Sequence, residues 1–306
     1  MDLHHVIEAQ QFDVPTLLRL IETTQAMEQV VAGGGTSQFP GRIMATLFYE
    51  PSTRTRFSFE TAMYRLGGSV ISTENAAEFS SVAKGETLED TVRILNGYAD
   101  VLVLRHHEVG SAKRAASVSR IPVINAGDGA GQHPTQALLD LYTIHKEIGS
   151  IDGLRIAMVG DLAQGRTVRS LTYLLSKFQN IRIYFAAPAL LKMKEDILDH
   201  LREKQVWYTE ETDLDKVLPE VDVVYQTRIQ KERFGDRIAD YEQCRGVYVI
   251  SSESLRLMKA TAIVMHPLPR LDEIAMEVDR DPRAAYFRQA QNGLYVRMAL
   301  LSMVLK

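Results

Sequence analysis

The sequence has very little cysteine: Cys244 is the only one among 306 residues. A disulfide within the chain is therefore excluded, and a lone cysteine is typical of proteins that work in a reducing compartment. The sequence also lacks apolar runs approaching the ~20 residues of a membrane span, and its first residues lack the basic-then-apolar pattern of a signal peptide. We expect a cytoplasmic protein with no membrane partner.

Basic charge is not in excess either. The net charge is -4, so no general positive field favours binding to nucleic acid, and any anion site must be local. A chain of 306 residues usually divides into more than one core, so we expect two domains.

What the sequence does contain is a repeated alternation of short apolar runs and segments with helical spacing. Such runs, β-branched and without strict alternation, are typical of strands buried on both faces of a parallel sheet. We therefore predict an α/β protein with two doubly wound parallel-sheet domains. The predicted strands are residues 43–48, 100–104, 121–125, 155–160, 181–187, 221–226 and 262–266.

The domain division is predicted from the helical segment at residues 133–149, which is followed by "SIDG" and a new strand. We place the first domain at residues 1–149 and the second at 150–284. The segment 285–306 is predicted to be a long helix that returns to pack on the first domain. Helices would then join the two domains.

Cationic or histidine side chains follow most of these predicted strands. Ligands of open α/β sheets bind beyond the carboxyl ends of the strands, so these residues are expected to gather positive charge in one cleft. Each arginine taken singly is better explained as a member of a surface ion pair, and only the group as a whole favours a cleft. The residues are Arg54, Arg105, His106, His133, Arg166, Arg228, His266 and Arg270.

The stretch "FYEPSTRTRFSFE" is the strongest of these signals. Pro51 and Ser52 lie where a helix should begin, and free N–H groups at a helix N-terminus bind anions. The hydroxyls that follow add donors, and Arg54 can hold two oxygens in bidentate fashion. Arg56 is expected to point elsewhere and to fix the turn. We predict a phosphate site here.

Two further segments carry candidate polar ligands. In "SSVAKGETLED", Thr87 and Asp90 resemble a capping box, which places Ser80 and Lys84 in the preceding loop. Lys84 could equally be a solvated surface lysine. In "GQHPTQALLD", Pro134 at the first helical position places His133 and Gln136 on the same side of a helix start.

The segment "GDLAQGRT" (160–167) is close to a P-loop, but Arg166 stands where that motif requires lysine. Lysine and arginine are not interchangeable in that role, so we do not predict an NTPase. Arg166 at a helix start suits a carboxylate ligand as well.

Taken together, these motifs resemble the aspartate/ornithine carbamoyltransferase family, and within it the catalytic chains of the aspartate enzymes. The likeness runs nearly end to end, through "FYEPSTRTRFSFE", "SSVAKGETLEDT", "LRHHEVGSA", "INAGDGAGQHPTQALLDLYTI", "GDLAQGRTVRSL", "YQTRIQKERF" and "HPLPRLDEI". The first motif is shared with the ornithine enzymes. Those enzymes carry a cysteine where this chain has Pro267.

The resemblance implies direct transfer of a carbamoyl group from carbamoyl phosphate to the amino group of L-aspartate, an early step of pyrimidine biosynthesis. It implies no metal or organic cofactor, and a homotrimer whose active sites are shared between neighbouring chains. By the same resemblance, the phosphate is held by Ser52, Thr53, Arg54, Thr55 and Arg105, with Ser80 and Lys84 arriving from a neighbouring chain.

The resemblance assigns the remaining site residues to the carbamoyl group and to aspartate. The carbonyl is polarised by Thr55, Arg105 and His133, and the carbamoyl nitrogen is oriented by Gln136 and by the backbone carbonyls of Pro267 and Leu268. The two carboxylates of aspartate are bound by Arg166, Arg228 and Gln230.

Two alternatives remain at this stage. One is an ornithine or other amino-acid carbamoyltransferase, although Arg228 and Gln230 favour a dicarboxylate. The other is an anion-binding module without turnover, which leaves the second cluster of cations unexplained. Regulatory chains or other pyrimidine-pathway enzymes as partners are left open by the sequence.

Overall fold

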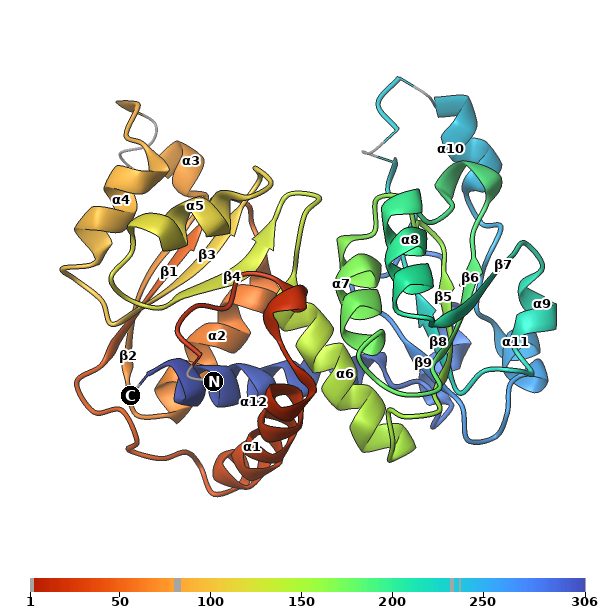
Figure 1. Cartoon of the computed structure of the whole chain (residues 1–306), viewed down its shortest axis with the longest axis horizontal. Helices are drawn as coiled ribbons and strands as arrows, with labels where there is room; N and C mark the ends of the chain where they lie inside the picture. The colour runs from red at the N-terminus through yellow and green to blue at the C-terminus, as the bar shows by residue number, and fades with distance from the viewer. Residues whose placement is uncertain (1–2, 80–83, 232–233, 237, 306) are drawn as a thin grey trace. The chain divides into compact units, whose positions relative to one another are not determined.

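A computed structural model of the chain describes residues 3–79, 84–231, 234–236 and 238–305 (Figure 1). These residues form two compact units. Unit 1 comprises the described residues up to Tyr142 and those from Gln291 on, and unit 2 runs from Thr143 to Ala290. The chain passes between the units inside helices α6 (Pro134–Ile148) and α12 (Tyr286–Val304). The division predicted from sequence was placed just after α6.

Unit 1 is built on a parallel sheet. Within its described residues, four strands pair in the order β2-β1-β3-β4. Their bounds are Ile43–Phe48 for β1, Ser69–Glu74 for β2, Val101–His106 for β3 and Val123–Asp128 for β4. Strand β1 lies where the sequence predicted it, and β3 and β4 overlap the predicted runs but extend beyond them, to His106 and Asp128. Strand β2 was not predicted.

Helices cover both faces of this sheet. In Figure 1, α4 and α5 lie on one face, and α2 and α12 lie on the other. Apolar side chains from alternate strand positions, such as Leu47 and Leu102, pack with Leu88 and Val92 of α4. The described helices of unit 1 are η1 (Ala9–Gln11), α1 (Val14–Ala32), α2 (Thr53–Arg65), α3 (Ala76–Phe79), α4 (Leu88–Leu95) and α5 (Ser111–Val118), with the unit 1 parts of α6 and α12.

Unit 2 contains a second parallel sheet. Its described strands pair in the order β7-β6-β5-β8-β9. Their bounds are Arg155–Val159 for β5, Arg182–Ala186 for β6, Trp207–Glu211 for β7, Val223–Gln226 for β8 and Ile263–Met265 for β9. Strand β7 is the one that the sequence did not predict. Two parallel-sheet α/β units confirm the predicted fold class.

The helices of unit 2 connect these strands, as right-handed crossovers in α/β proteins require. Buried residues including Val159, Val224 and Val264 form the core between the sheet and the helices. The described helices are α7 (Arg166–Leu175), η3 (Ala189–Leu191), α8 (Glu195–Glu203), α9 (Leu214–Val217), α10 (Ile238–Cys244), α11 (Ser252–Leu257) and η5 (Met276–Arg280).

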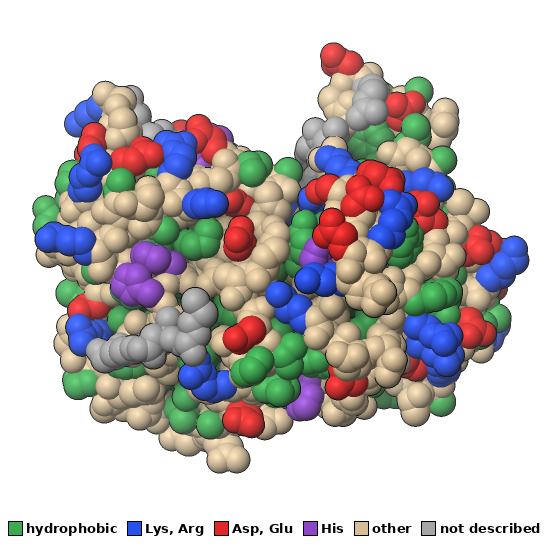
Figure 2. All heavy atoms as spheres, in the orientation of Figure 1, with side chains coloured by type: hydrophobic (Ala, Val, Ile, Leu, Met, Phe, Trp, Pro, Cys, Tyr) green, Lys and Arg blue, Asp and Glu red, His purple; other side chains and the backbone are tan. Residues whose placement is uncertain are grey.

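The surface carries both signs of charge. Figure 2 shows Lys and Arg side chains interspersed with Asp and Glu on the face displayed. Among the helices that the structure describes, none has both the length and the apolar character needed to cross a membrane.

Candidate active site

In unit 1, the predicted site residues follow the carboxyl ends of three adjacent strands. Strand β3 pairs in parallel with both β1 and β4, so the ends of all three lie at one edge of the sheet. Ser52, Thr53, Arg54 and Thr55 come after β1, Arg105 lies near the end of β3, and His133 and Gln136 come after β4. The topology therefore brings these residues to one edge, where ligands bind in such sheets.

Helix α2 begins at this edge with a set of free backbone donors. Ser52 is its N-cap residue, and the first bond of the helix runs from the Arg56 N–H to the Ser52 carbonyl, at 3.0 Å. The N–H groups of Thr53, Arg54 and Thr55 precede that bond and have no carbonyl of the helix to pair with. Together with the helix dipole, they favour an anion at this end.

Arg54 and Arg105 supply the positive charge of this edge. Partial shielding from water lowers the pKa of Arg54 below its ordinary value, and the group still remains a cation at neutral pH. The guanidinium of Arg105 donates to the carbonyl of Ala126 at 3.2 Å and lies 3.5 Å from a carboxylate oxygen of Glu50. These contacts fix Arg105 between the ends of β1 and β4.

His133 and Gln136 are presented by the loop and helix that follow β4. Gly129 in this loop has φ +53°, and a Cβ there would lie only 2.3 Å from the carbonyl oxygen of His107, so the loop requires glycine. Helix α6 begins at Pro134, as predicted. His133 and Gln136 are both buried, and the Gln136 amide nitrogen donates to Asp140 one turn along the helix, at 2.8 Å.

Lys84 is the first residue that the structure describes after position 79. It is exposed and precedes α4, whose N-cap Thr87 accepts a hydrogen bond from the N–H of Asp90 at 3.1 Å, so the predicted helix start is correct. Ser80 lies outside the described residues. The structure of one chain leaves the assignment of Lys84 to a neighbouring chain a prediction.

In unit 2, the second group of predicted residues also follows three adjacent strands. Strand β8 pairs in parallel with β5 and β9. Arg166 is the first residue of α7 after β5, Arg228 and Gln230 follow β8, and Pro267 and Leu268 follow β9. At Gly160, φ is +106° and a Cβ would lie 2.4 Å from the carbonyl oxygen of Thr227. The ends of β5 and β8 therefore approach each other more closely than a side chain would allow.

The loop after β9 is held by a buried hydrogen-bonded pair. The N–H of Leu268 donates to Nδ1 of His266 at 2.8 Å, so the ring proton must be on Nε2, which lies 2.8 Å from Glu273 Oε1. Glu273 also accepts from the N–H of Leu271, at 3.2 Å. Burial works to raise the pKa of Glu273, but the hydrogen bonds from His266 and Leu271 hold it below its ordinary value.

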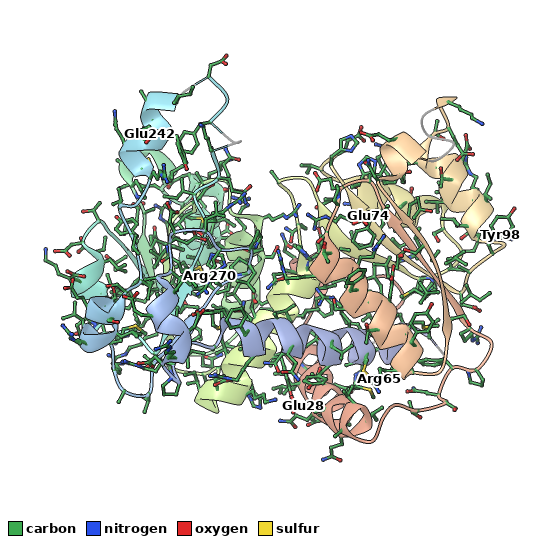
Figure 3. The ribbon with its side chains drawn as sticks, turned by 180° about the vertical axis from the view of Figure 1, so that it is seen from behind. Glu28, Arg65, Glu74, Tyr98, Glu242 and Arg270 are labelled. Atoms are coloured by element: carbon green, nitrogen blue, oxygen red, sulfur yellow. The ribbon has the colours of Figure 1, made fainter. Side chains whose placement is uncertain are left out.

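Three of the side chains expected to supply positive charge at strand ends do not act as free charges. Arg270 (Figure 3) is bound to Asp279 and lies over the rings of Tyr286 and Phe287. Both ring nitrogens of His266 are occupied within the protein, one by the Leu268 N–H and the other by Glu273. Burial and the neighbouring His107 lower the pKa of His106 to about 4, so it is neutral. The prediction of available positive charge was wrong at these three positions.

Arg56 points away from the anion-binding end of α2, as expected. Its guanidinium lies 2.9 Å from Glu74, labelled in Figure 3, and 3.7 Å from Glu60. Because Glu74 ends β2, this ion pair ties the start of α2 to the edge strand of the sheet.

Sequence reasoning missed two carboxylates that support the site. Asp140 is spaced four residues from Gln136, and an aspartate inside the apolar run "ALLDLY" was a signal that a buried polar contact existed. Glu273 had no comparable signal, because its contact with His266 depends on how the loop after β9 folds back.

We expect Glu273→Ala to lower the free energy of unfolding of the protein by about 2–4 kcal/mol, because it removes the acceptor of the buried His266 Nε2–H and of the Leu271 N–H. The folded-state pKa of Glu273 is depressed, so its contribution is present above the unfolded pKa and is lost as the pH falls through the folded pKa. Urea unfolding between pH 7 and pH 3 should therefore show the difference between wild type and Glu273→Ala staying constant down to about pH 5 and shrinking below it. A difference that stays constant over the whole of this pH range would contradict this account.

Comparison with known protein families shows which family the chain belongs to. Residues 4–146 match the carbamoyl-phosphate-binding domain of aspartate/ornithine carbamoyltransferases, and residues 152–304 match the Asp/Orn-binding domain of the same family. The chain belongs to this family. The predicted site residues of unit 1 lie in the carbamoyl-phosphate-binding domain of this carbamoyltransferase, and those of unit 2 lie in its Asp/Orn-binding domain.

Individual relatives agree with this assignment. The chain is 60% identical to aspartate carbamoyltransferase 1, chloroplastic, of Pisum sativum, over 99% of this chain and 79% of that protein. It is 49% identical to the aspartate carbamoyltransferase catalytic subunit of Methanocaldococcus jannaschii, over 99% and 98% of the two chains. Aspartate transcarbamoylase from Trypanosoma cruzi in complex with N-(phosphonacetyl)-L-aspartic acid matches with a TM-score of 0.94 and 45% identity, over 99% of this chain and 96% of that one.

Residues that could hold a metal are not grouped in the described parts of this carbamoyltransferase: no three His, Cys, Asp or Glu side chains there lie together as a metal site would need.

Proposed function

We propose that this chain is an aspartate carbamoyltransferase, which forms N-carbamoyl-L-aspartate and phosphate from carbamoyl phosphate and L-aspartate in pyrimidine synthesis. The observation that carries the proposal is the placement of an anion-binding helix start, an anchored arginine and a His–Gln pair at one sheet edge of the carbamoyl-phosphate-binding domain. Relatives named for this reaction support it, and so do solved structures of the Trypanosoma cruzi enzyme with carbamoyl phosphate and aspartate.

The reaction is a direct acyl transfer. The amino nitrogen of aspartate attacks the carbamoyl carbon, the bond from that carbon to the bridging phosphate oxygen breaks, and the nitrogen gives up its proton as phosphate leaves. No covalent intermediate with the protein is needed. Catalysis then depends on holding two anions in line and stabilising the charge that develops on the carbonyl oxygen and on the departing phosphate.

Residues of unit 1 fit the first of these substrates. The free N–H groups at the start of α2 and the cation of Arg54 suit the phosphate, whose dianion complements both. Arg105 and His133 are donors for the carbonyl oxygen. Each donor aimed at the developing oxyanion is worth about 3–4 kcal/mol in transition-state stabilisation. The full set proposed here is Ser52, Thr53, Arg54, Thr55, Arg105, His133 and Gln136.

Residues of unit 2 fit the second substrate. Arg166 at the start of α7 offers both a cation and a helix N-terminus to a carboxylate, and Arg228 and Gln230 offer further donors after β8. The carbonyls of Pro267 and Leu268 are held by the His266 contact, and they suit the N–H groups of a carbamoyl nitrogen.

We also propose that the enzyme is a homotrimer in which Ser80 and Lys84 complete a neighbouring chain's site. The exposed position of Lys84 supports this proposal, since the residue is available to a partner. A reducing, cytoplasmic compartment is proposed on the ground of the single cysteine, although the pea relatives are named chloroplastic forms.

A panel of amine acceptors tests the reaction. With carbamoyl phosphate as donor, we expect the purified protein to form carbamoyl-aspartate in a colorimetric assay and to give no product with ornithine, because Arg166 and Arg228 complement two carboxylates. Arg228→Leu should raise the KM for aspartate by about 100-fold, the loss of one charge-assisted bidentate contact.

Surface arginine Arg93, which pairs with Asp90 at 2.8 Å, provides the matched control, and Arg93→Leu should leave the KM unchanged. Product with ornithine and none with aspartate would overturn the choice of acceptor. No product with any amine would favour an anion-binding module instead.

A further inference from the structure

Asp140 is the buried carboxylate that receives the amide of Gln136. It lies four residues after Gln136 on α6, its exposed fraction is 0%, and its Oδ1 accepts from Gln136 Nε2 at 2.8 Å. An ionised carboxylate can only accept hydrogen bonds. The NH2 side of the Gln136 amide must therefore face Asp140, and its oxygen, Oε1, faces the opposite way.

The negative charge of Asp140 is balanced by a buried arginine on another helix. Arg297 of α12 has an exposed fraction of 4%, lies over the ring of Phe59 at 5.0 Å and interacts electrostatically with Asp140. Gly293, one turn earlier on α12, makes room for it, because a Cβ there would lie 2.4 Å from Nη1 of Arg297. Burial lowers the pKa of Arg297 to about 10 while the charge of Asp140 works to raise it, so Arg297 stays charged at neutral pH.

We propose that Asp140, supported by Arg297, is a positioning residue that sets which acyl phosphate the enzyme accepts, by locking the Gln136 amide with its oxygen toward the substrate. This inference rests on the proposed function. An oxygen in that place accepts an N–H of the carbamoyl NH2 group. A methyl group, as in acetyl phosphate, has no N–H to offer and leaves the buried oxygen unpaired.

The orientation of the Gln136 amide that Asp140 fixes therefore affects recognition of one part of the substrate only. Carbamoyl phosphate and acetyl phosphate share the phosphate and the carbonyl and differ at this single group. If the Gln136 amide is free to rotate by 180°, its NH2 group faces the NH2 group of the carbamoyl substrate. Two hydrogen-bond donors then face each other, and the preference for the carbamoyl group falls. Losses in folding, phosphate binding or oxyanion stabilisation lower the turnover of both donors alike.

The test is the ratio of kcat/KM for carbamoyl phosphate to kcat/KM for acetyl phosphate, both with aspartate as acceptor. The ratio cancels the concentration of folded enzyme, so a variant that folds poorly still gives an interpretable value. The variant is Asp140→Leu/Arg297→Met, which removes both charges and leaves no unpaired buried ion. We expect its ratio to fall by about tenfold, the value of one hydrogen bond to a substrate N–H.

Two matched variants complete the experiment. Tyr142→Phe lies on the same helix and loses the hydrogen bond that its hydroxyl donates to Glu28 at 2.6 Å, and its ratio should equal that of wild type. In a Gln136→Leu background, the Asp140→Leu/Arg297→Met changes should cause no further fall in the ratio, because they act through Gln136.

The outcomes separate this inference from the proposed function. A ratio unchanged in Asp140→Leu/Arg297→Met, with both activities lowered equally, would show a merely structural role and overturn the inference. A further fall of the ratio in the Gln136→Leu background would overturn it too. A wild-type protein without carbamoyl transfer to aspartate would defeat the proposed function itself.

Discussion

Arg54→Ala should lower kcat by about 10³-fold while changing the KM for aspartate far less, because its charge acts on the departing phosphate. The residue lies in the first turn of α2, where free N–H groups and the helix dipole already favour an anion. The guanidinium of nearby Arg56 is held by Glu74, so it cannot replace Arg54, and the backbone donors carry only partial charge. Steady-state kinetics with both substrates varied measures the effect.

Arg54→Lys is the conservative variant in this experiment. It restores a positive charge but not the planar pair of donors, so we expect an activity between those of wild type and Arg54→Ala. An Arg54→Ala enzyme with an unchanged kcat would remove this arginine from the mechanism. A loss confined to the KM for aspartate would place it on the other substrate.

Mixing two inactive variants should restore activity if the site is shared. Arg54→Ala and Lys84→Ala are each expected to be nearly inactive alone. After the two are unfolded together and refolded, a chain with intact Arg54 can lie beside one with intact Lys84. In random trimers of equal parts, about a quarter of the sites would have both residues intact, and activity should approach that fraction of wild type.

The control is to refold each variant alone and to combine the products without unfolding. Neither parent trimer contains a complete site, so activity should stay absent until subunits exchange. Mixed trimers that remain inactive, with exchange shown by a tagged chain, would assign Lys84 to its own chain and refute a site shared between neighbours.

The buried part of the fold follows from local sequence, and the exposed edges do not. Strands β1, β5 and β8 are apolar runs because both of their faces are covered, and such runs are visible without a structure. Strands β2 and β7 are edge strands with mostly half-exposed or exposed side chains, in "SVISTE" and "WYTEE". No burial pattern distinguishes those sequences from a loop.

The site shows the same difference between local and long-range information. Pro134 and Thr87 mark helix starts within a few residues, so the positions of His133 and Gln136 were predictable. The charge that a side chain can offer depends on what packs against it, and this is why the predictions for His106 and Arg270 were wrong. Asp140 meets Arg297 only because α12 returns to α6, over more than half the length of the chain.

The return of α12 to unit 1 affects the order in which the two units of the enzyme can be completed during synthesis. Unit 1 contains the described residues from Gln291 on, which leave the ribosome after all of unit 2. Domains generally fold as units during synthesis, and here the second unit is complete in sequence before the first. Until α12 has been synthesised and has docked, Asp140 lacks the nearby charge of Arg297 and Phe59 lacks its covering guanidinium. The carbamoyl phosphate site, although most of its residues emerge early, is therefore completed last.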